Sequence, residues 1–382
     1  MTDGSYRLRL PGPTEVPTRV REAGARPIVS HRGADFHVVM RDVQSMLRPI
    51  FGAAGPILLF AASGTGMMEA ALVNILGPGT RALIIANGQF GERFAAIARE
   101  LGGIVETIEV PWGEAVDTGA VAARLRRHQY RAVIAIHNES STGVVTDLAA
   151  LGRITRDTPT LLVADTVSGI GGIPVEQDAW GVDIVIAAAH KALMCPPGLG
   201  LASLSTKAWD TVRQDQGVPR FYWDFRRCRE AAAKDETPFT PPVSLVMALA
   251  EALRMMTKEG MAAVLTRHRR CAAALRAGAA AIGLASFPRS ASLSHTVSVF
   301  VVPPDLEGGA IVRRLYEKHR TVIAGARNRL AGKVIRIGTM GDIHGGDILT
   351  DLAHLEETLA ALGHRFSRGA GIAAAEAVLA AP

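Results

Sequence analysis

Cysteine is scarce in this chain of 382 residues, which has only Cys195, Cys228 and Cys271. Their spacing matches neither a disulfide framework nor a zinc site, so we expect no cross-link and no bound metal. This excludes small disulfide-stabilised domains and zinc fingers. The same cysteine usage makes a reducing compartment, the cytoplasm, the expected location.

Long hydrophobic runs are also missing. The first residues, MTDGSYRLRLPGPTEVP, lack the apolar stretch of a signal peptide. No run approaches the roughly 18 residues that a membrane helix needs. Charges of both signs are interspersed, so the net charge of +6 fits small anionic substrates or an ordinary solvated surface. We therefore expect neither a membrane nor a nucleic acid as partner.

Lysine is rare compared with arginine. Only six of the 42 basic residues are lysine, and Lys191 is the first of them. It follows the apolar run IVIAAA of residues 184–189, and a Pro-Pro-Gly turn follows it at 196–198. Burial at the end of such a strand lowers the pKa of an amine and makes it nucleophilic toward carbonyl groups. A surface lysine at a strand end is the alternative interpretation.

The fold class follows from the order of the hydrophobic patterns. Hydrophobic residues make up 48% of the chain and charged residues 20%, which is typical of globular proteins. Short apolar runs alternate with helical patterns through the first two thirds. This alternation predicts a doubly wound α/β domain with a mainly parallel sheet. The predicted strands are 57–61, 82–86, 104–110, 132–136, 160–164, 183–188 and 201–204.

The pattern changes after residue 240. The proline-rich stretch TPFTPPVS leads into two long predicted helices, at 243–257 and 260–281. The strands HTVSVFVV and VIRIG follow, with helices between and after them. We therefore predict a smaller α+β domain over residues 261–382, with a boundary near residue 260.

The stretch AASGTGMMEAAL has the form of a phosphate-binding turn, and we call its residues Ser63, Gly64 and Thr65 the phosphate cup. A strand ends at Ala61 and a helix begins near Thr65, so unpaired N–H groups of the helix face an anion. Ser63 and Thr65 add hydroxyls, and Gly64 lets the backbone come close to a ligand. The stretch matches neither the Walker motif nor Gly-x-Gly-x-x-Gly, and an ordinary helix N-cap is the alternative.

Two further charged residues are candidates for the same site. Asp165 follows four apolar strand residues, where a carboxylate needs a partner such as a protonated ring nitrogen. An N-cap or a metal ligand are alternatives. Arg336 in VIRIGTMG is able to bind a carboxylate in a bidentate fork, although one arginine in an arginine-rich chain carries little weight. Together these features meet the needs of pyridoxal 5'-phosphate (PLP) and its substrate. The SGT turn would bind the phosphate, Asp165 the ring nitrogen, Lys191 the aldehyde and Arg336 the carboxylate of the substrate.

With these features the chain resembles the class V aminotransferases of PLP fold type I, specifically the alanine–glyoxylate and serine–glyoxylate (serine–pyruvate) family. The likeness extends over nearly the whole chain. It rests on motifs in the same order: LPGPTEVP, SGTGMMEAAL, NGQFGERF, HNESSTGVV, VADTVSGIGGIPV, HKALMCPPGLG, TPPVS and RIGTMG. The resemblance implies a large domain with a mainly parallel seven-stranded sheet and a smaller C-terminal α+β domain.

The resemblance also implies roles for individual residues. Lys191 matches the catalytic lysine that forms the Schiff base, and Asp165 matches the partner of the pyridinium nitrogen. Arg336 matches the arginine that binds the substrate carboxylate. Ser63, Gly64 and Thr65 match the phosphate-binding turn, and Ser140 matches a hydroxyl near the cofactor. Phe90 matches the ring that stacks on the pyridine, and Gly12 lies in the N-terminal segment that lines the pocket. That segment covers residues 1–15 and leaves 16–260 for the large domain.

A homodimer with shared active sites is a further implication. In the family the loop that carries TPFTPP comes from the neighbouring subunit, so Thr240 and Thr237 would contact the phosphate across the interface. Relatives often have tyrosine where this chain has Thr237. They usually have glutamine where this chain has His190, which is still able to donate to the phosphate but titrates near neutrality.

The function implied is ping-pong transamination from an alanine- or serine-type donor to glyoxylate or pyruvate, through pyridoxamine phosphate. A transaminase for an atypical amine, such as pyridoxamine, an aminophosphonate or a biosynthetic intermediate, is the first alternative. A PLP-dependent lyase is less favoured, because a desulfurase needs a cysteine that TVIAGARNRLAGKVIRIG lacks. A non-catalytic or nucleotide-binding α/β protein is the alternative from another class, but it leaves the ordered motifs unexplained. His344 in the TMGDIHGGD turn either faces the pocket or caps a helix that starts near Asp347, and we expect the cap.

Overall fold

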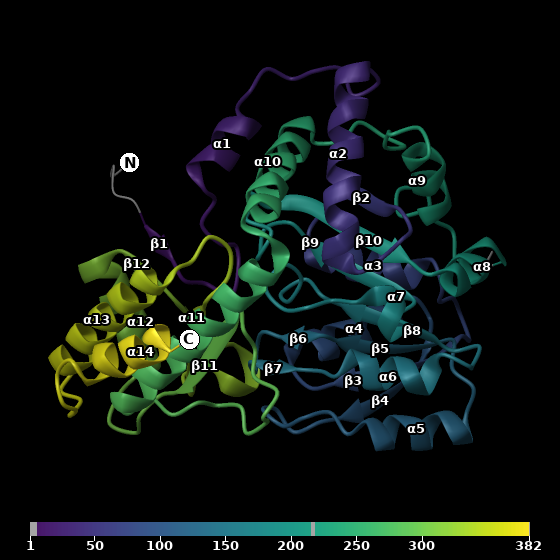
Figure 1. Cartoon of the computed structure of the whole chain (residues 1–382). Coiled ribbons are helices and arrows are strands. Elements are labelled where there is room, and N and C mark those ends of the chain that lie inside the picture. Colours follow the sequence, from purple (N-terminus) through teal and green to yellow (C-terminus); the bar gives the residue numbers. More distant parts are fainter. Residues whose placement is uncertain (1–5, 215–217, 382) are drawn as a thin grey trace.

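The computed structural model describes residues 6–214 and 218–381. A large sheet with helices on both faces occupies one side of the molecule, and a small sheet with its own helices occupies the other (Figure 1). The first five residues of the predicted segment 1–15 lie outside the described part. No helix in the described part is long and apolar enough to span a membrane.

The large sheet has seven strands in the order β2-β10-β9-β8-β5-β3-β4. Its pairs are parallel except those of β10, which runs antiparallel to β2 and β9. The strands are β2 (Ile57–Ala62), β3 (Arg81–Ala86), β4 (Ile104–Glu109), β5 (Ala132–Ile136), β8 (Leu161–Asp165), β9 (Ile184–Ala188) and β10 (Gly198–Leu204). The predicted fold class and all seven predicted strands are confirmed, and β10 begins three residues earlier than predicted because pairing with β2 extends it to Gly198.

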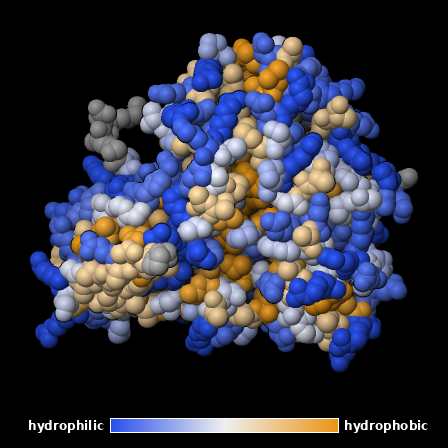
Figure 2. Space-filling view, viewed as in Figure 1, coloured by the Kyte–Doolittle hydropathy of each residue, from blue (hydrophilic) through white to orange (hydrophobic). Residues whose placement is uncertain are grey.

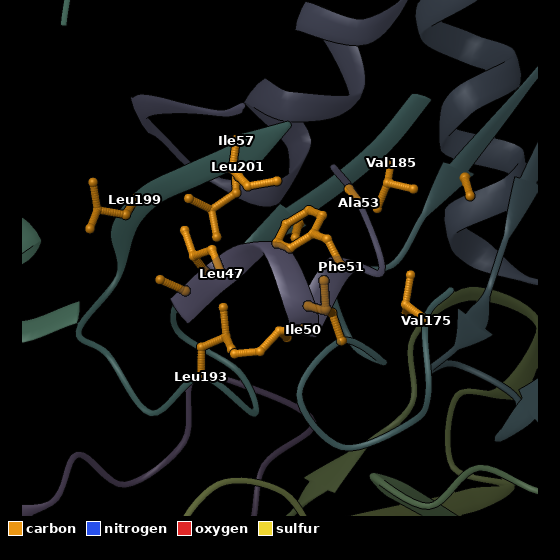
Figure 3. Close-up of a cluster of buried hydrophobic side chains, with 14 of the residues drawn as sticks. Leu47, Ile50, Phe51, Ala53, Ile57, Val175, Val185, Leu193, Leu199 and Leu201 are labelled. Atoms are coloured by element: carbon orange, nitrogen blue, oxygen red, sulfur yellow. The ribbon is translucent and has the colours of Figure 1, made fainter. Parts of the chain in front are cut away.

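The apolar runs of the strands are continuous because both faces of the sheet are buried. Leu58 and Leu59, neighbours on β2, belong to different hydrophobic clusters, as the alternation of side chains along a strand requires. The first cluster includes residues of α2 (Ala34–Phe51), α6 (Leu148–Thr155) and α10 (Val243–Glu259). Figure 3 shows the last turns of α2 packed over the sheet in this cluster.

The second cluster covers the opposite face. Its helices are α3 (Gly64–Val73), α4 (Gln89–Glu100), α8 (Thr206–Gln214) and α9 (Phe225–Ala232). The remaining helices of this half of the molecule are α1 (Thr18–Gly24), α5 (Thr118–Arg127) and α7 (Gln177–Trp180). Helices on both faces leave the carboxyl edge of the parallel strands as the place where loops converge.

The small sheet is antiparallel, with strands in the order β11-β14-β13, and a third hydrophobic cluster lies against it. Its strands are β11 (Val297–Val301), β13 (Ala324–Gly325) and β14 (Val334–Gly338). The helices of this half are α11 (Met261–Ala281), α12 (Gly308–His319), α13 (Gly345–Ala361) and α14 (Ala370–Ala380), with a 3-10 turn η1 (Asn328–Leu330). Gly260 separates α10 from α11, at the position where we predict the domain boundary.

The N-terminal segment lies between the two halves. Its short strand β1 (Arg7–Leu8) pairs with β12 (Thr321–Val322) beside the small sheet. Arg9 donates to the buried carboxylate of Asp351 on α13, with the Nε 2.6 Å from Oδ2. The chain then crosses to the large sheet, where the N–H of Thr14 donates to the carbonyl of His190. The segment is therefore fixed at both ends.

Candidate active site

A cavity of about 170 Å³ opens at the carboxyl edge of the large sheet. It lies where β2, β5, β8 and β9 end, which is the position expected for a ligand in a doubly wound sheet. Eight of the predicted site residues line it: Ser63, Gly64, Thr65, Phe90, Ser140, Asp165, His190 and Lys191. Residues from five separate stretches of the sequence thus meet at one edge.

Lys191 follows β9 and is only 8% exposed. Its Nζ donates to the carbonyl oxygen of Pro11, 2.5 Å away. Burial lowers the pKa of Lys191 to about 8, and the negative charge of Asp165 only partly opposes this shift. About a tenth of the amine is therefore unprotonated at pH 7, far more than for an exposed lysine, and this neutral form is the nucleophile.

Asp165 is the last residue of β8 and is 5% exposed. Its Oδ1 accepts a hydrogen bond from the N–H of Val167 at 2.8 Å. Burial raises the pKa of Asp165 to about 7, which the hydrogen bond from Val167 opposes and the charge of Glu139 reinforces. A cationic group in the cavity would favour the ionised form again, so the site suits a protonated ring nitrogen.

Ser63 caps the N-terminus of α3. Its Oγ accepts from the N–H of Gly66 at 3.2 Å, while Thr65 and Gly64 begin the helix. A Cβ added to Gly64 would lie 3.1 Å from a methyl group of Val167, so glycine fits closely here. The N-cap interpretation and the phosphate-binding interpretation are both compatible with this geometry, because Ser63 caps the N–H of Gly66 while Ser63, Gly64 and Thr65 all line the cavity.

Phe90 is held by a carboxylate that the sequence reasoning missed. Its backbone N–H donates to Oε2 of Glu139 at 3.0 Å. Glu139 lies on the hairpin of β6 (Asn138–Glu139) and β7 (Val144–Val145), fully buried, and also accepts from the N–H groups of Gly91 and Ser141 and from the Ser141 hydroxyl. Burial raises the pKa of Glu139 and these donors oppose it. Glu139 thus fixes the start of α4.

Arg93 is the second residue that the sequence reasoning missed. It lines the cavity, and its guanidinium lies 4.7 Å from the centre of the Phe90 ring. Its Nη1 donates to the hydroxyl of Thr65 at 2.9 Å. The signal was present in NGQFGERF, since residues three apart on a helix share a face and Arg93 is three after Phe90.

His190 lines the cavity and carries a buried ring nitrogen without a hydrogen-bond partner in the described part of the chain. Its Nδ1 is buried and has no hydrogen-bond partner within the described residues. Burial lowers the pKa of His190 to about 4, and the charge of Lys191 adds to this effect. The imidazole is therefore neutral at physiological pH. An unpaired ring nitrogen beside the cup, the amine and the acid shows that these residues fit a phosphorylated pyridine aldehyde.

Gly12 and Arg336 lie next to the cavity. Gly12 has a φ of +121°, and a Cβ there would lie 2.6 Å from two carbons of the Lys191 side chain. Arg336 on β14 donates to the carbonyl oxygens of Gly325 and Ser140. Burial lowers the pKa of Arg336, and the charge of Glu139 opposes this. The hydrogen-bond partners of Arg336 are neutral carbonyl groups. Its positive charge is therefore available to bind a carboxylate.

Thr237 and Thr240 are not brought to this cavity. Thr237 is buried and its hydroxyl donates to the carbonyl of Phe239 at 2.7 Å. Both threonines line a separate small cavity with Tyr222. Their contact with a phosphate across a dimer interface stays a prediction. His344 occupies the N-cap position of α13, one residue before its start at Gly345.

The comparisons with known proteins cover nearly the whole chain. A family model described as Aminotransferase class-V matches residues 18–330. The chain is similar to the soluble hydrogenase 42 kDa subunit of Anabaena cylindrica, at 37% identity over 98% of this chain and 99% of that protein. It is 34% identical to the serine–glyoxylate aminotransferase of Methylorubrum extorquens, over 98% of this chain and 96% of that protein. The ureidoglycine–glyoxylate aminotransferase structure from Bacillus subtilis matches with a TM-score of 0.94 at 27% identity, covering 99% of both chains.

Proposed function

The chain belongs to the class-V aminotransferases, and on this premise we propose that it transfers the amino group of an alanine- or serine-type donor to glyoxylate or pyruvate. Aminotransferases of this class depend on PLP. The observation that carries the proposal is the pair of Lys191 and Asp165, one with its pKa lowered and the other with its pKa raised, in one cavity beside Arg336.

The proposed cofactor contacts follow from the cavity lining. Lys191 would hold the aldehyde carbon, and Asp165 would pair with the ring nitrogen. Phe90 would cover the ring. The phosphate would meet the cup and His190, together with Thr237 and Thr240 of a second copy. When bound, the cofactor supplies an electron-accepting ring that stabilises negative charge at the substrate Cα.

Individual residues of the chain would each have a separate role in the reaction. Arg336 would bind the donor carboxylate and so fix the direction of the Cα–H bond. The Nζ of Lys191, with a pKa near 8, would accept the proton from the substrate Cα. It would then donate this proton to the aldehyde carbon of the cofactor. Asp165 would keep the ring nitrogen protonated. The carbonyl of Pro11 would hold the amine when it is free.

Two similar aminotransferases share the same amino acceptor, which supports glyoxylate as the acceptor of this chain. Both named aminotransferases use glyoxylate, whereas their donors differ. The match to a ureidoglycine-using enzyme favours a specialised amine donor as the second candidate. A donor panel separates the two, because an alanine- or serine-type donor must give turnover in the first case.

A homodimer in the cytoplasm is part of the proposal. Support for a second copy comes from exposed hydrophobic side chains, Ile28 at 73%, Phe221 at 63% and Val38 at 49%. Figure 2 shows hydrophobic residues exposed over the start of α2, on an otherwise largely hydrophilic rim. The measurement is the mass of the purified protein in solution by light scattering.

The central test uses purified protein with L-alanine or L-serine and glyoxylate. We expect glycine to form together with the matching 2-oxo acid, and the visible absorbance of the cofactor to change with the donor alone. Lys191→Ala is the control and should lose both signals. If no tested donor yields glycine and the absorbance stays constant, the proposed function is wrong.

A further inference from the structure

Arg93 has no role in the contacts proposed so far, although it lines the cavity beside the cup. We propose that Arg93 binds the phosphate of the cofactor within its own chain and supplies the positive charge that the cup lacks. The inference rests on the proposed function only through the presence of PLP, and not on the identity of the substrates.

The first argument is charge balance. A phosphate monoester carries about −1.5 to −2 charges at neutral pH. Ser63, Gly64 and Thr65 offer neutral groups, and the two threonines of the predicted neighbouring loop are neutral as well. His190 is also neutral, because burial lowers its pKa to about 4. None of the contacts suggested by the family motifs therefore carries a full positive charge.

The second argument is the position of the guanidinium. Through its bond to Thr65, Arg93 sits at the N-terminus of α3, a helix of ten residues. The positive end of the helix dipole disfavours a cation there unless an anion lies between them. Within residues 6–214 and 218–381, Arg93 has no carboxylate oxygen within 4.0 Å. A phosphate in the cup would attract both the helix end and the guanidinium.

The third argument concerns the hydroxyl of Thr65. Its Oγ accepts the N–H of Arg93, so its own hydrogen is free to donate elsewhere. A phosphate oxygen at the mouth of the cup would receive that hydrogen and an N–H of the guanidinium together. The charges of both arginines act on the pKa of Lys191, but different groups hold the two guanidiniums. Arg336 is bonded to the carbonyls of Gly325 and Ser140, whereas Arg93 is bonded to Thr65 of the phosphate-binding turn.

The test compares PLP with pyridoxal, which lacks the phosphate. Cofactor-free protein is titrated with each, and binding is followed by visible absorbance. Arg93→Gln should weaken PLP binding roughly 10- to 100-fold, as expected for a charged hydrogen bond. It should change pyridoxal binding by less than about twofold, because the ring contacts remain. Inorganic phosphate should compete with PLP in the wild type and much less in the variant.

Two further variants complete the design. Arg99→Gln removes a charge from the exposed side of the same helix and should leave both affinities unchanged. Arg93→Lys keeps the charge without the fork, so PLP binding should fall by less than about tenfold. This variant also serves if Arg93→Gln unfolds, which circular dichroism reveals. An equal loss for both ligands would mean that Arg93 only supports Phe90, and the proposal would be overturned.

An unchanged PLP affinity combined with a raised KM for donors would also overturn it, because Arg93 would then bind substrate. The result is separable from the test of the proposed function. Wild-type protein that binds PLP but forms no glycine contradicts the substrate assignment alone. Protein that forms glycine with the same PLP affinity in Arg93→Gln contradicts the role of Arg93 alone.

Discussion

Gly12 lies so close to Lys191 that a Cβ on Gly12 would be 2.6 Å from both Cδ and Cε of the lysine. The φ of +121° at Gly12 is one that other residues rarely adopt. The N-terminal segment therefore reaches the amine only because this position is glycine. Its predicted place in the site is a consequence of that fit.

Gly12→Ala should lower cofactor occupancy and reduce kcat/KM by roughly 100-fold or more, because the Lys191 side chain must shift away from the added methyl group and out of its position for reaction. Backbone strain should also cost about 1–3 kcal/mol of unfolding free energy. The matched control is Gly79→Ala, since Gly79 has a φ of +77° but nothing within 4 Å of its added Cβ. Equal activity in both variants would contradict the assigned contact.

The reactivity of Lys191 should depend on pH with a midpoint near 8. The neutral amine is the reactive form, and burial lowers the pKa of Lys191 from its ordinary value of 10.5 to about 8. Capture of PLP by cofactor-free protein should therefore accelerate as the pH rises from 6 to about 9. Stopped-flow absorbance measures the rate, and a midpoint near 10 would contradict the effect of burial.

Asp165→Asn should shift that midpoint downward. The charge of Asp165 raises the pKa of Lys191, whereas burial lowers it. When the charge of Asp165 is removed, the effect of burial dominates further and the pKa of Lys191 falls. Asn keeps the side-chain volume and the hydrogen bond from Val167. An upward shift of the midpoint, or none, in the same stopped-flow assay would show that the two groups do not interact as the structure indicates.

The same substitution should stabilise the cofactor-free protein. Burial raises the pKa of Asp165 from 3.8 in the unfolded chain to about 7, so the folded state binds the proton more tightly. The stability contributed by the neutral carboxyl is then present below pH 3.8 and lost as the pH rises to about 7. Asp165→Asn avoids this loss, which amounts to at most about 4 kcal/mol.

Urea denaturation at several pH values checks this prediction. The gain in unfolding free energy over the wild type should grow between pH 4 and pH 7 and then level off. Addition of PLP should reverse the order of stability, since only the wild type pairs with the ring nitrogen. A gain that does not depend on pH would trace to packing and not to the carboxyl.

The residues at strand ends were predictable for a physical reason. Asp165 directly follows an apolar run and Lys191 lies two residues after one, and parallel strands bring their carboxyl ends to one edge. The prediction needed only the order of strands and helices. The strands of the large sheet follow from the same pattern, whereas Phe90, Ser140 and His190 were predicted only from the resemblance to the family.

Other parts of the site depend on packing that no local pattern reveals. Glu139 matters because four donors from α4 and its own hairpin converge on it, and Pro11 matters through a backbone carbonyl. Neither contact is signalled by residue type. Thr237 lies apart from the cavity within the single chain, and its predicted contact with a phosphate concerns a second copy of the chain.

His190→Gln introduces the residue that the resemblance to the family leads us to expect at this position. Because the pKa of His190 is lowered to about 4, the substitution exchanges one neutral hydrogen-bonding group for another above pH 6. We expect PLP affinity to change by less than about fivefold and the pH profile of kcat to keep its shape. Loss of an acidic limb near pH 6.5 would instead show that a protonated His190 takes part.

Arg336→Gln should affect the substrate and spare the cofactor. Removing a buried guanidinium that binds a carboxylate should raise the KM for the amino donor by roughly 10- to 100-fold. PLP affinity should stay within about twofold, because the contacts of Arg336 are carbonyls outside the cup. The donor half-reaction, followed by cofactor absorbance, separates the two effects. A donor that lacks the carboxylate provides the control, since its slow reaction should not change between wild type and variant. If both donors are affected alike, Arg336 acts by holding the Ser140 and Gly325 backbone and not by binding substrate.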